Sequence, residues 1–359
     1  MQKLNFSAGI VTFAAIAALA GCGGGSTSSP SKPQFSAVVS FGDSLSDVGS
    51  YAVATTDPKT GVVTGGRFTT NPGPIWIEDI AAKLNLTLTP NVTGYGTLSV
   101  TCPKPNCTGY GQGGSRVTDI NGIGHSTGAL TIPMKTQMDN HLAANPTYKA
   151  TDLVFVYGGN NDVFYQAGYV SAVVAGASAA PGATAASVAA AGAAAQQTAG
   201  AAMATAATEL AGYVRDKIIA KGAKYVVVMN LPDSAATPYG VSLGANAALL
   251  TGLVNTFNTA FQQAVTTMAL DVVMIDANAA NKDVFANQVQ YGVTNATTPA
   301  CDLVKLAPYG SSSLFCNATT LIPSANAGFL FADSVHPTTF GHKLFSDYVT
   351  LQLAKKGWF

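Results

Sequence analysis

Four short apolar segments constrain the fold of this chain more than any other feature. They are rich in valine and isoleucine, and each ends at or just before a glycine, asparagine or aspartate. Near-continuous apolar runs of this kind are typical of parallel strands covered on both faces. The segments comprise residues 37–41, 152–157, 224–230 and 271–276.

Segments with helical character separate or follow these runs, notably residues 75–84, 246–268 and 339–355. Strands that alternate with helices predict a parallel sheet with helices on both faces. We therefore expect an α/β fold of three layers (α/β/α), with a flavodoxin-like doubly wound sheet.

Residues suited to catalysis occur in two segments, the turn after the first predicted strand and a loop near the C-terminus. Ser44 follows the first strand, and in open α/β sheets the carboxyl ends of strands carry the chemistry. A serine hydroxyl needs a neighbouring base before it becomes a good nucleophile. Asp333 and His336 supply an orienting carboxylate and a base in one short loop before Pro337. The sequence thus predicts Ser44 as nucleophile, His336 as general base and then acid, and Asp333 as the group that orients the imidazole.

Residues 41–49, Phe-Gly-Asp-Ser-Leu-Ser-Asp-Val-Gly, resemble the signature of the GDSL, or SGNH, family of ester hydrolases. Further pieces similar to that family follow in the family's order: the glycine cluster 109–117, the Gly-Gly-Asn-Asn-Asp loop 158–162 and the Asp-x-x-His-Pro segment 333–337. The resemblance implies an SGNH hydrolase fold without a metal or organic cofactor. It also implies an oxyanion hole formed by the backbone amides of Ser44 and Gly114 and the side-chain amide of Asn161.

The Asp-Ser-Leu-Ser-Asp form of the first motif resembles the lipase, esterase and phospholipid-acyltransferase branch of the family. This implies a carboxylic ester hydrolase that acts through an acyl-enzyme on lipid, short-chain or aryl esters. Phospholipid acyl transfer is one alternative, because it shares the acyl-enzyme and differs only in the acceptor. A non-catalytic binding lipoprotein of the envelope is another.

A second serine motif competes with Ser44. Residues 240–244, Gly-Val-Ser-Leu-Gly, match the G-x-S-x-G nucleophile elbow, and Asp276 and His336 follow in the required order. An elbow needs a strand that leads directly into its serine, whereas residues 235–239 contain a proline and no apolar strand. We therefore favour Ser44 over Ser242.

The N-terminal residues indicate export. After Lys3, residues 6–20 are mostly apolar and too few to span a bilayer comfortably, as in a signal peptide over residues 1–21. Leu-Ala-Gly-Cys at 19–22 resembles the bacterial lipobox, which implies lipidation of Cys22; a plain secretory signal is the alternative. The protein would then be anchored to the membrane by its lipid, at the outer membrane of a bacterial cell envelope, or be secreted.

Composition completes the domain prediction. Residues 22–34 are rich in glycine and serine and predict a disordered tether, which leaves one hydrolase domain over 35–359. Within it, residues 169–210 are mainly alanine, glycine, serine and threonine, and predict an irregular helical insertion that could cover the site.

Charge and cysteine content exclude two classes of partner. Charged residues make up only 10% of the chain, and eighteen basic side chains balance eighteen acidic ones, so nucleic acid is not an expected partner. Without Cys22, four cysteines remain, and the simplest pairing in an exported protein is Cys102 with Cys107 and Cys301 with Cys316; two other pairings stay open. Zinc is not expected, because no histidine lies near the C-x4-C pair.

Overall fold

A four-stranded parallel sheet forms the centre of the computed structural model, which describes residues 32–57, 59–61, 63–103 and 107–359. The strand order is β1-β4-β5-β6. The strands are β1 (Ala37–Gly42), β4 (Asp152–Tyr157), β5 (Tyr225–Met229) and β6 (Val273–Ile275). All four predicted apolar runs therefore form strands of one sheet. The predicted signal peptide and Cys22 lie outside the described residues.

The outer edge of β1 carries a single bridge instead of a full fifth strand. Ser40 pairs in parallel with Gly109, and the backbone amide of Tyr110 donates to the Ser40 carbonyl at 2.7 Å. A side chain at Gly109 would collide with Val48, since an added Cβ would lie 2.5 Å from it. The glycine cluster therefore runs along β1 and reaches the same sheet edge as the turn that follows β1.

Helices cover both faces of the sheet, so the predicted three-layer fold is confirmed. One face packs against α1 (Trp76–Lys83) and α10 (Thr339–Lys355), where the Trp76 ring meets Phe155 of β4 edge to face at 5.5 Å. The other face packs against helices that share a core of valine, methionine, phenylalanine and alanine. These helices are α2 (Met134–Ala144), α3 (Asn160–Ala179), α4 (Ala185–Tyr213) and α6 (Ala247–Thr267).

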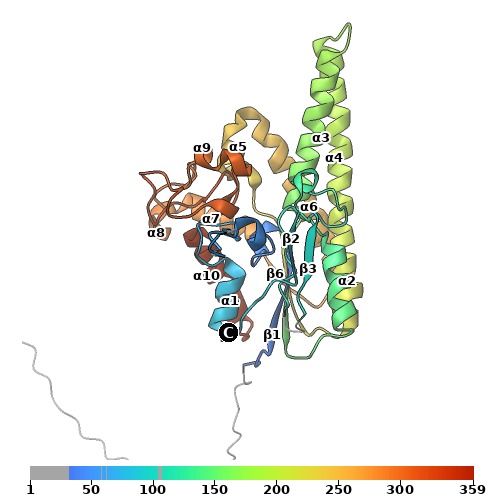
Figure 1. Cartoon of the computed structure of the whole chain (residues 1–359). Helices are drawn as coiled ribbons and strands as arrows, with labels where there is room; N and C mark the ends of the chain where they lie inside the picture. The colour runs from blue at the N-terminus through green and yellow to red at the C-terminus, as the bar shows by residue number, and fades with distance from the viewer. Residues whose placement is uncertain (1–31, 58, 62, 104–106) are drawn as a thin grey trace, which may run out of the picture. The chain divides into compact units, whose positions relative to one another are not determined.

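The alanine-rich segment forms a regular helical hairpin of α3 and α4, which extends well past the rest of the fold in Figure 1. The two helices meet at a turn through Pro181 and Gly182, and Thr184 caps α4 by accepting from the Ser187 amide at 3.1 Å. No charged residue occurs between Asp162 and Glu209. The expected irregularity is absent because alanine favours helix strongly and its small side chain lets α4 pack closely on α3 and α6.

Shorter elements complete the fold around the sheet edge. Two disulfides, Cys102–Cys107 and Cys301–Cys316, are present. Among the residues that the structure describes, none of the helices is both long and apolar enough to cross a bilayer. The remaining elements are β2 (Val92–Tyr95), β3 (Leu98–Thr101), α5 (Pro238–Ser242), α7 (Ala277–Ala286), α8 (Gln288–Tyr291) and α9 (Leu303–Leu306).

Candidate active site

The turn after β1 places Ser44 at the carboxyl edge of the sheet. Gly42 ends the strand against β4, where an added Cβ would lie 2.4 Å from the Tyr157 carbonyl oxygen. Asp43 then accepts a hydrogen bond from the Leu45 amide at 3.1 Å and caps a single turn of 3₁₀ helix. Ser44 begins this turn, and its side chain lines a cavity of about 1050 Å³.

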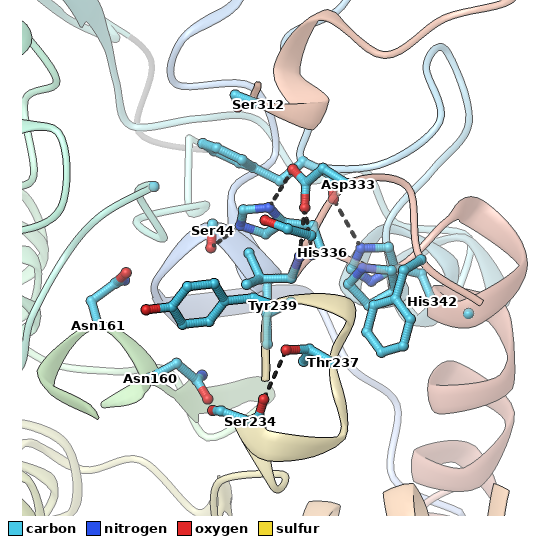
Figure 2. Close-up of a pocket in the computed structure, with 18 of the residues that line it drawn as sticks. Ser44, Asn160, Asn161, Ser234, Thr237, Tyr239, Ser312, Asp333, His336 and His342 are labelled. Carbon is cyan, nitrogen blue, oxygen red and sulfur yellow. Dashed lines mark hydrogen bonds and ion pairs between the residues drawn. The ribbon is translucent and has the colours of Figure 1, made fainter. Parts of the chain in front are cut away.

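Ser44, His336 and Asp333 form a continuous hydrogen-bonded line (Figure 2). Ser44 Oγ lies 2.8 Å from Nε2 of His336, and Nδ1 of the same ring lies 2.8 Å from Oδ2 of Asp333. A carboxylate can only accept, so the Nδ1 proton faces Asp333 and Nε2 is left to accept the serine hydroxyl. The three residues come from two loops that are far apart in the sequence.

Asp333 is held as an anion by its surroundings. Burial by itself would raise its pKa, but the facing His336 and the hydrogen bonds from the His336 and Val335 amides outweigh burial and lower the pKa to about 2. The Ser313 amide also donates to Oδ2 at 2.7 Å. Ser313 lies in the loop that the Cys301–Cys316 disulfide closes, so this disulfide is coupled to the position of Asp333.

Phe68 lies against the imidazole of His336, and His342 in turn contacts Phe68. The Phe68 ring lies 4.8 Å from the His336 ring, and His342 Nε2 donates to the Phe68 carbonyl at 3.3 Å. Burial lowers the pKa of His342 to about 3, so its ring is neutral near neutral pH. The role of His342 has no sequence signal beyond its place in the predicted last helix, residues 339–355.

Ser44, Gly114 and Asn161, which are predicted to supply the oxyanion donors, all line this cavity. Within the described part of the chain, the backbone amides of Ser44 and Gly114 have no hydrogen-bond acceptor, whereas the Gly113 amide donates to Asp47 at 2.9 Å. Gly114 adopts φ +78°, which favours glycine. Asn161 Nδ2 donates to the Ser115 carbonyl at 2.9 Å and has a second N–H, because an amide NH₂ carries two protons.

Two buried aspartates, which the sequence interpretation left without a role, tie these loops together. Asp47 accepts from the amides of Gly49 and Ser50 and from the Gly113 amide, and so joins the serine turn to the glycine cluster. Asp162 accepts from the Arg116 guanidinium at 2.9 Å and from the Val117 amide at 3.0 Å. Both lie inside the motifs quoted above, but the contacts join segments that are distant in sequence.

Ser242, the alternative nucleophile, lies outside the cavity that Ser44 lines. Ser242 ends α5, its Oγ donates to the Tyr239 carbonyl at 2.7 Å, and its side chain does not line the cavity. No strand leads into it, because a 3₁₀ turn and α5 precede it. In the described residues, no group of three or more His, Cys, Asp or Glu side chains is placed to hold a metal ion.

Comparison with known proteins assigns the chain to a family. The family model described as GDSL-like Lipase/Acylhydrolase matches residues 38–349. No curated protein matches. Two solved structures are similar: an extracellular lipase from Streptomyces rimosus (16% identity, 88% of this chain and 98% of that chain covered, TM-score 0.41) and phospholipase A1 from Streptomyces albidoflavus NA297 (14%, 90% and 100%, TM-score 0.43). Because the family model spans most of the sequence, this chain belongs to the GDSL-like lipase/acylhydrolase family and is a carboxylic ester hydrolase.

Proposed function

We propose that this protein hydrolyses carboxylic esters through an acyl-enzyme, with Ser44 as nucleophile, His336 as general base and acid, and Asp333 as the orienting carboxylate. The observation that carries the proposal is the line of two 2.8 Å hydrogen bonds from Ser44 through His336 to Asp333. This arrangement supplies what a serine nucleophile needs: a base within reach and a fixed tautomer of that base.

The reaction follows from these contacts. Ser44 Oγ attacks the ester carbonyl carbon while His336 Nε2 takes the hydroxyl proton, and Asp333 stabilises the imidazolium that results. The tetrahedral intermediate then collapses, and His336 returns the proton to the departing alcohol oxygen. Water repeats the sequence on the acyl-enzyme and releases the carboxylic acid. Acyl transfer to another alcohol would use the same acyl-enzyme with a different acceptor.

We propose that the backbone amides of Ser44 and Gly114 and the side chain of Asn161 form an oxyanion hole, which stabilises the negatively charged oxygen of the tetrahedral intermediate. The open Ser44 and Gly114 amides and the spare Asn161 N–H support this assignment. Removal of one such donor costs roughly 3 kcal/mol of transition-state stabilisation.

The cavity supports short-chain, aryl or lipid esters as substrates. Tyrosine, phenylalanine, leucine and isoleucine side chains make up much of its wall, and such a surface accommodates acyl chains or aromatic leaving groups. The apolar lining residues include Tyr51, Tyr95, Ile123, Leu314 and Phe315.

We further propose that the protein is exported, as a single hydrolase domain over residues 35–359 that follows a tether at 22–34. Two disulfides support export, because such bonds persist in oxidising compartments. Lipidation of Cys22, and with it anchoring to the outer membrane, rests on the lipobox-like sequence alone. Mass spectrometry of the mature N-terminus, compared with a Cys22→Ser variant, tests the anchor: an unmodified Cys22 would contradict it.

A fluorophosphonate probe tests the catalytic assignment, because it labels only an activated serine. We expect labelling at Ser44 in the wild-type enzyme. Ser44→Ala should abolish labelling and lower kcat for p-nitrophenyl butyrate by about 10⁴-fold or more. Ser242→Ala is the matched control and should keep both properties. Full activity of the Ser44 variant would overturn the proposal.

A further inference from the structure

A second group of polar side chains lines the cavity beside the triad, at the carboxyl ends of β4 and β5. Asn160 begins α3 directly after β4, Ser234 follows β5, and Tyr239 lies on α5. All three line the cavity together with Ser44, and Figure 2 draws them on one side of it. Asn160 is 8% exposed and Ser234 is 3% exposed.

These side chains have hydrogen-bonding capacity that the described residues do not use. Asn160 Nδ2 donates to Asp43 Oδ2 at 3.0 Å, which leaves Asn160 Oδ1 without a partner in the described structure. Ser234 Oγ and Tyr239 Oη likewise have no partner among the described residues. Asn160 and Ser234 are buried and Tyr239 is 36% exposed, and all three line the cavity, so their unused hydrogen-bonding capacity is available to a polar ligand there.

The backbone around these groups is held in place. Thr237 Oγ1 donates to the Ser234 carbonyl at 2.7 Å and accepts from the Gly240 amide at 3.1 Å. The Tyr239 ring packs edge to face on Phe164, with 5.8 Å between ring centroids. The group is therefore preorganised, which lowers the entropic cost of binding a substrate.

The contact between α5 and the histidine loop identifies the part of the ester that this group faces. The Tyr239 amide donates to the Ser334 carbonyl at 2.8 Å, and Ser334 directly follows Asp333 in the loop that carries His336. His336 must protonate the departing oxygen, so the alcohol part of the ester lies on the His336 side of the carbonyl carbon. Tyr239 thus stands beside the alcohol part.

The charges around the cavity select among alcohols. Neither lysine nor arginine lines the cavity among the described residues, whereas the acidic residues Asp233, next to Ser234, and Asp283 do. An anionic headgroup would meet no cation there and would face a like charge. Asn160 Oδ1 can only accept hydrogen bonds, whereas the hydroxyl groups of Ser234 and Tyr239 can both donate and accept. Such a set of groups can bind the neutral hydroxyl groups of a substrate alcohol.

We propose that Asn160, Ser234 and Tyr239 form a binding site for the hydroxyl groups of a neutral polyol alcohol, so that the enzyme prefers esters such as monoacylglycerols over esters of simple alcohols. The inference rests on the proposed function of Ser44, His336 and Asp333 and narrows its substrate class.

The test compares glycerol monobutyrate with propyl butyrate, which share the acyl chain and a three-carbon alcohol and differ in two hydroxyl groups. Each kcat/KM is divided by the rate of alkaline hydrolysis of the same ester, so that differences in chemical reactivity cancel. We expect the wild-type enzyme to prefer the glycerol ester by about tenfold or more, as one or two neutral hydrogen bonds provide.

Tyr239→Phe and Ser234→Ala should each lower kcat/KM for glycerol monobutyrate about fivefold to tenfold more than they lower kcat/KM for propyl butyrate. The matched control is Tyr165→Phe, an exposed tyrosine of α3 that does not line the cavity, and it should leave both rates unchanged. Equal normalised rates for the two esters, or a preference that survives both variants, would overturn the inference. If the wild-type enzyme hydrolyses propyl butyrate but shows no preference, only the polyol site fails; if it hydrolyses neither ester, the proposed function fails as well.

Discussion

Replacement of Asp333 by asparagine separates the charge of this side chain from its shape. Four N–H groups converge on the carboxylate: His336 Nδ1 and the Ser313 amide on Oδ2, and the amides of Val335 and His336 on Oδ1. Asparagine has one oxygen, so its NH₂ group must face one of these pairs. If the oxygen keeps the two amides of its own loop, the NH₂ group faces His336 Nδ1, which must then give up its proton to accept.

The consequence for catalysis is a change of tautomer. The ring proton of His336 would sit on Nε2, where the nitrogen can no longer accept the proton of the Ser44 hydroxyl. We expect kcat to fall by about 10⁴-fold, the loss that a wrong tautomer produces in a serine triad.

The same substitution should also change stability with a defined pH dependence. The pKa of Asp333 is about 2 in the folded protein, below the ordinary value of 3.8. The carboxylate therefore stabilises the fold fully above pH 3.8, and this contribution is lost as the pH falls through about 2. Its size is about 2 kcal/mol, which Asp333→Asn removes at neutral pH.

The assays are kcat with p-nitrophenyl butyrate and urea unfolding followed by circular dichroism. Asp302→Asn is a suitable control, because Asp302 caps α9 in the neighbouring loop and asparagine caps helices equally well. A folded Asp333→Asn enzyme with kcat within tenfold of the wild type would refute the reasoning about the tautomer.

Three further predictions concern the oxyanion donor, a disulfide and a buried histidine. Asn161→Ala should lower kcat for p-nitrophenyl butyrate by about 100-fold with little change in KM, and a rise in KM at constant kcat would contradict its role. Replacement of Cys301 and Cys316 by serine should lower the free energy of unfolding in urea by about 3 kcal/mol, because the bond closes a loop with a sequence separation of 15; unchanged unfolding would contradict this. Burial lowers the pKa of His141 from 6.5 to about 4, and neither ring nitrogen has a hydrogen-bond partner in the described structure, so stability should fall by about 3 kcal/mol as the pH drops from 6.5 to 4. His141→Phe should remove most of this loss in urea unfolding at the two pH values, and an unchanged pH dependence would count against the explanation.

The strands were predictable because their signal is local. The run at 152–157 matches β4, which is buried along its whole length and therefore apolar throughout. The run at 271–276 is shortened to Val273–Ile275, because β6 lies at the sheet edge and pairs with β5 alone. Asp276 leaves the strand to cap α7 by accepting from the Ala279 amide. Ends of elements depend on such neighbours and are harder to predict than the elements themselves.

The alanine-rich hairpin shows where local propensity is insufficient. Scattered glycines within residues 169–210 predict irregular structure, because each costs a helix about 1 kcal/mol relative to alanine. In the folded chain, close packing of α4 on α3 and α6 offsets this cost: Gly192, for example, is buried, and an added Cβ there would lie 3.2 Å from Val174. The regular hairpin is thus a result of tertiary contacts.

By itself, the sequence determined the fold class, the order of the motifs and the pairing of Asp333 with His336, since a separation of three residues within one loop allows few geometries. Only the tertiary structure decided which distant groups meet. Asp47 reaches the Gly113 amide because the glycine cluster runs along β1, and Asn160 and Ser234 share one wall because β4 and β5 are neighbours in the sheet. Contacts between such residues depend on strand order and loop closure, which no local pattern of side chains encodes.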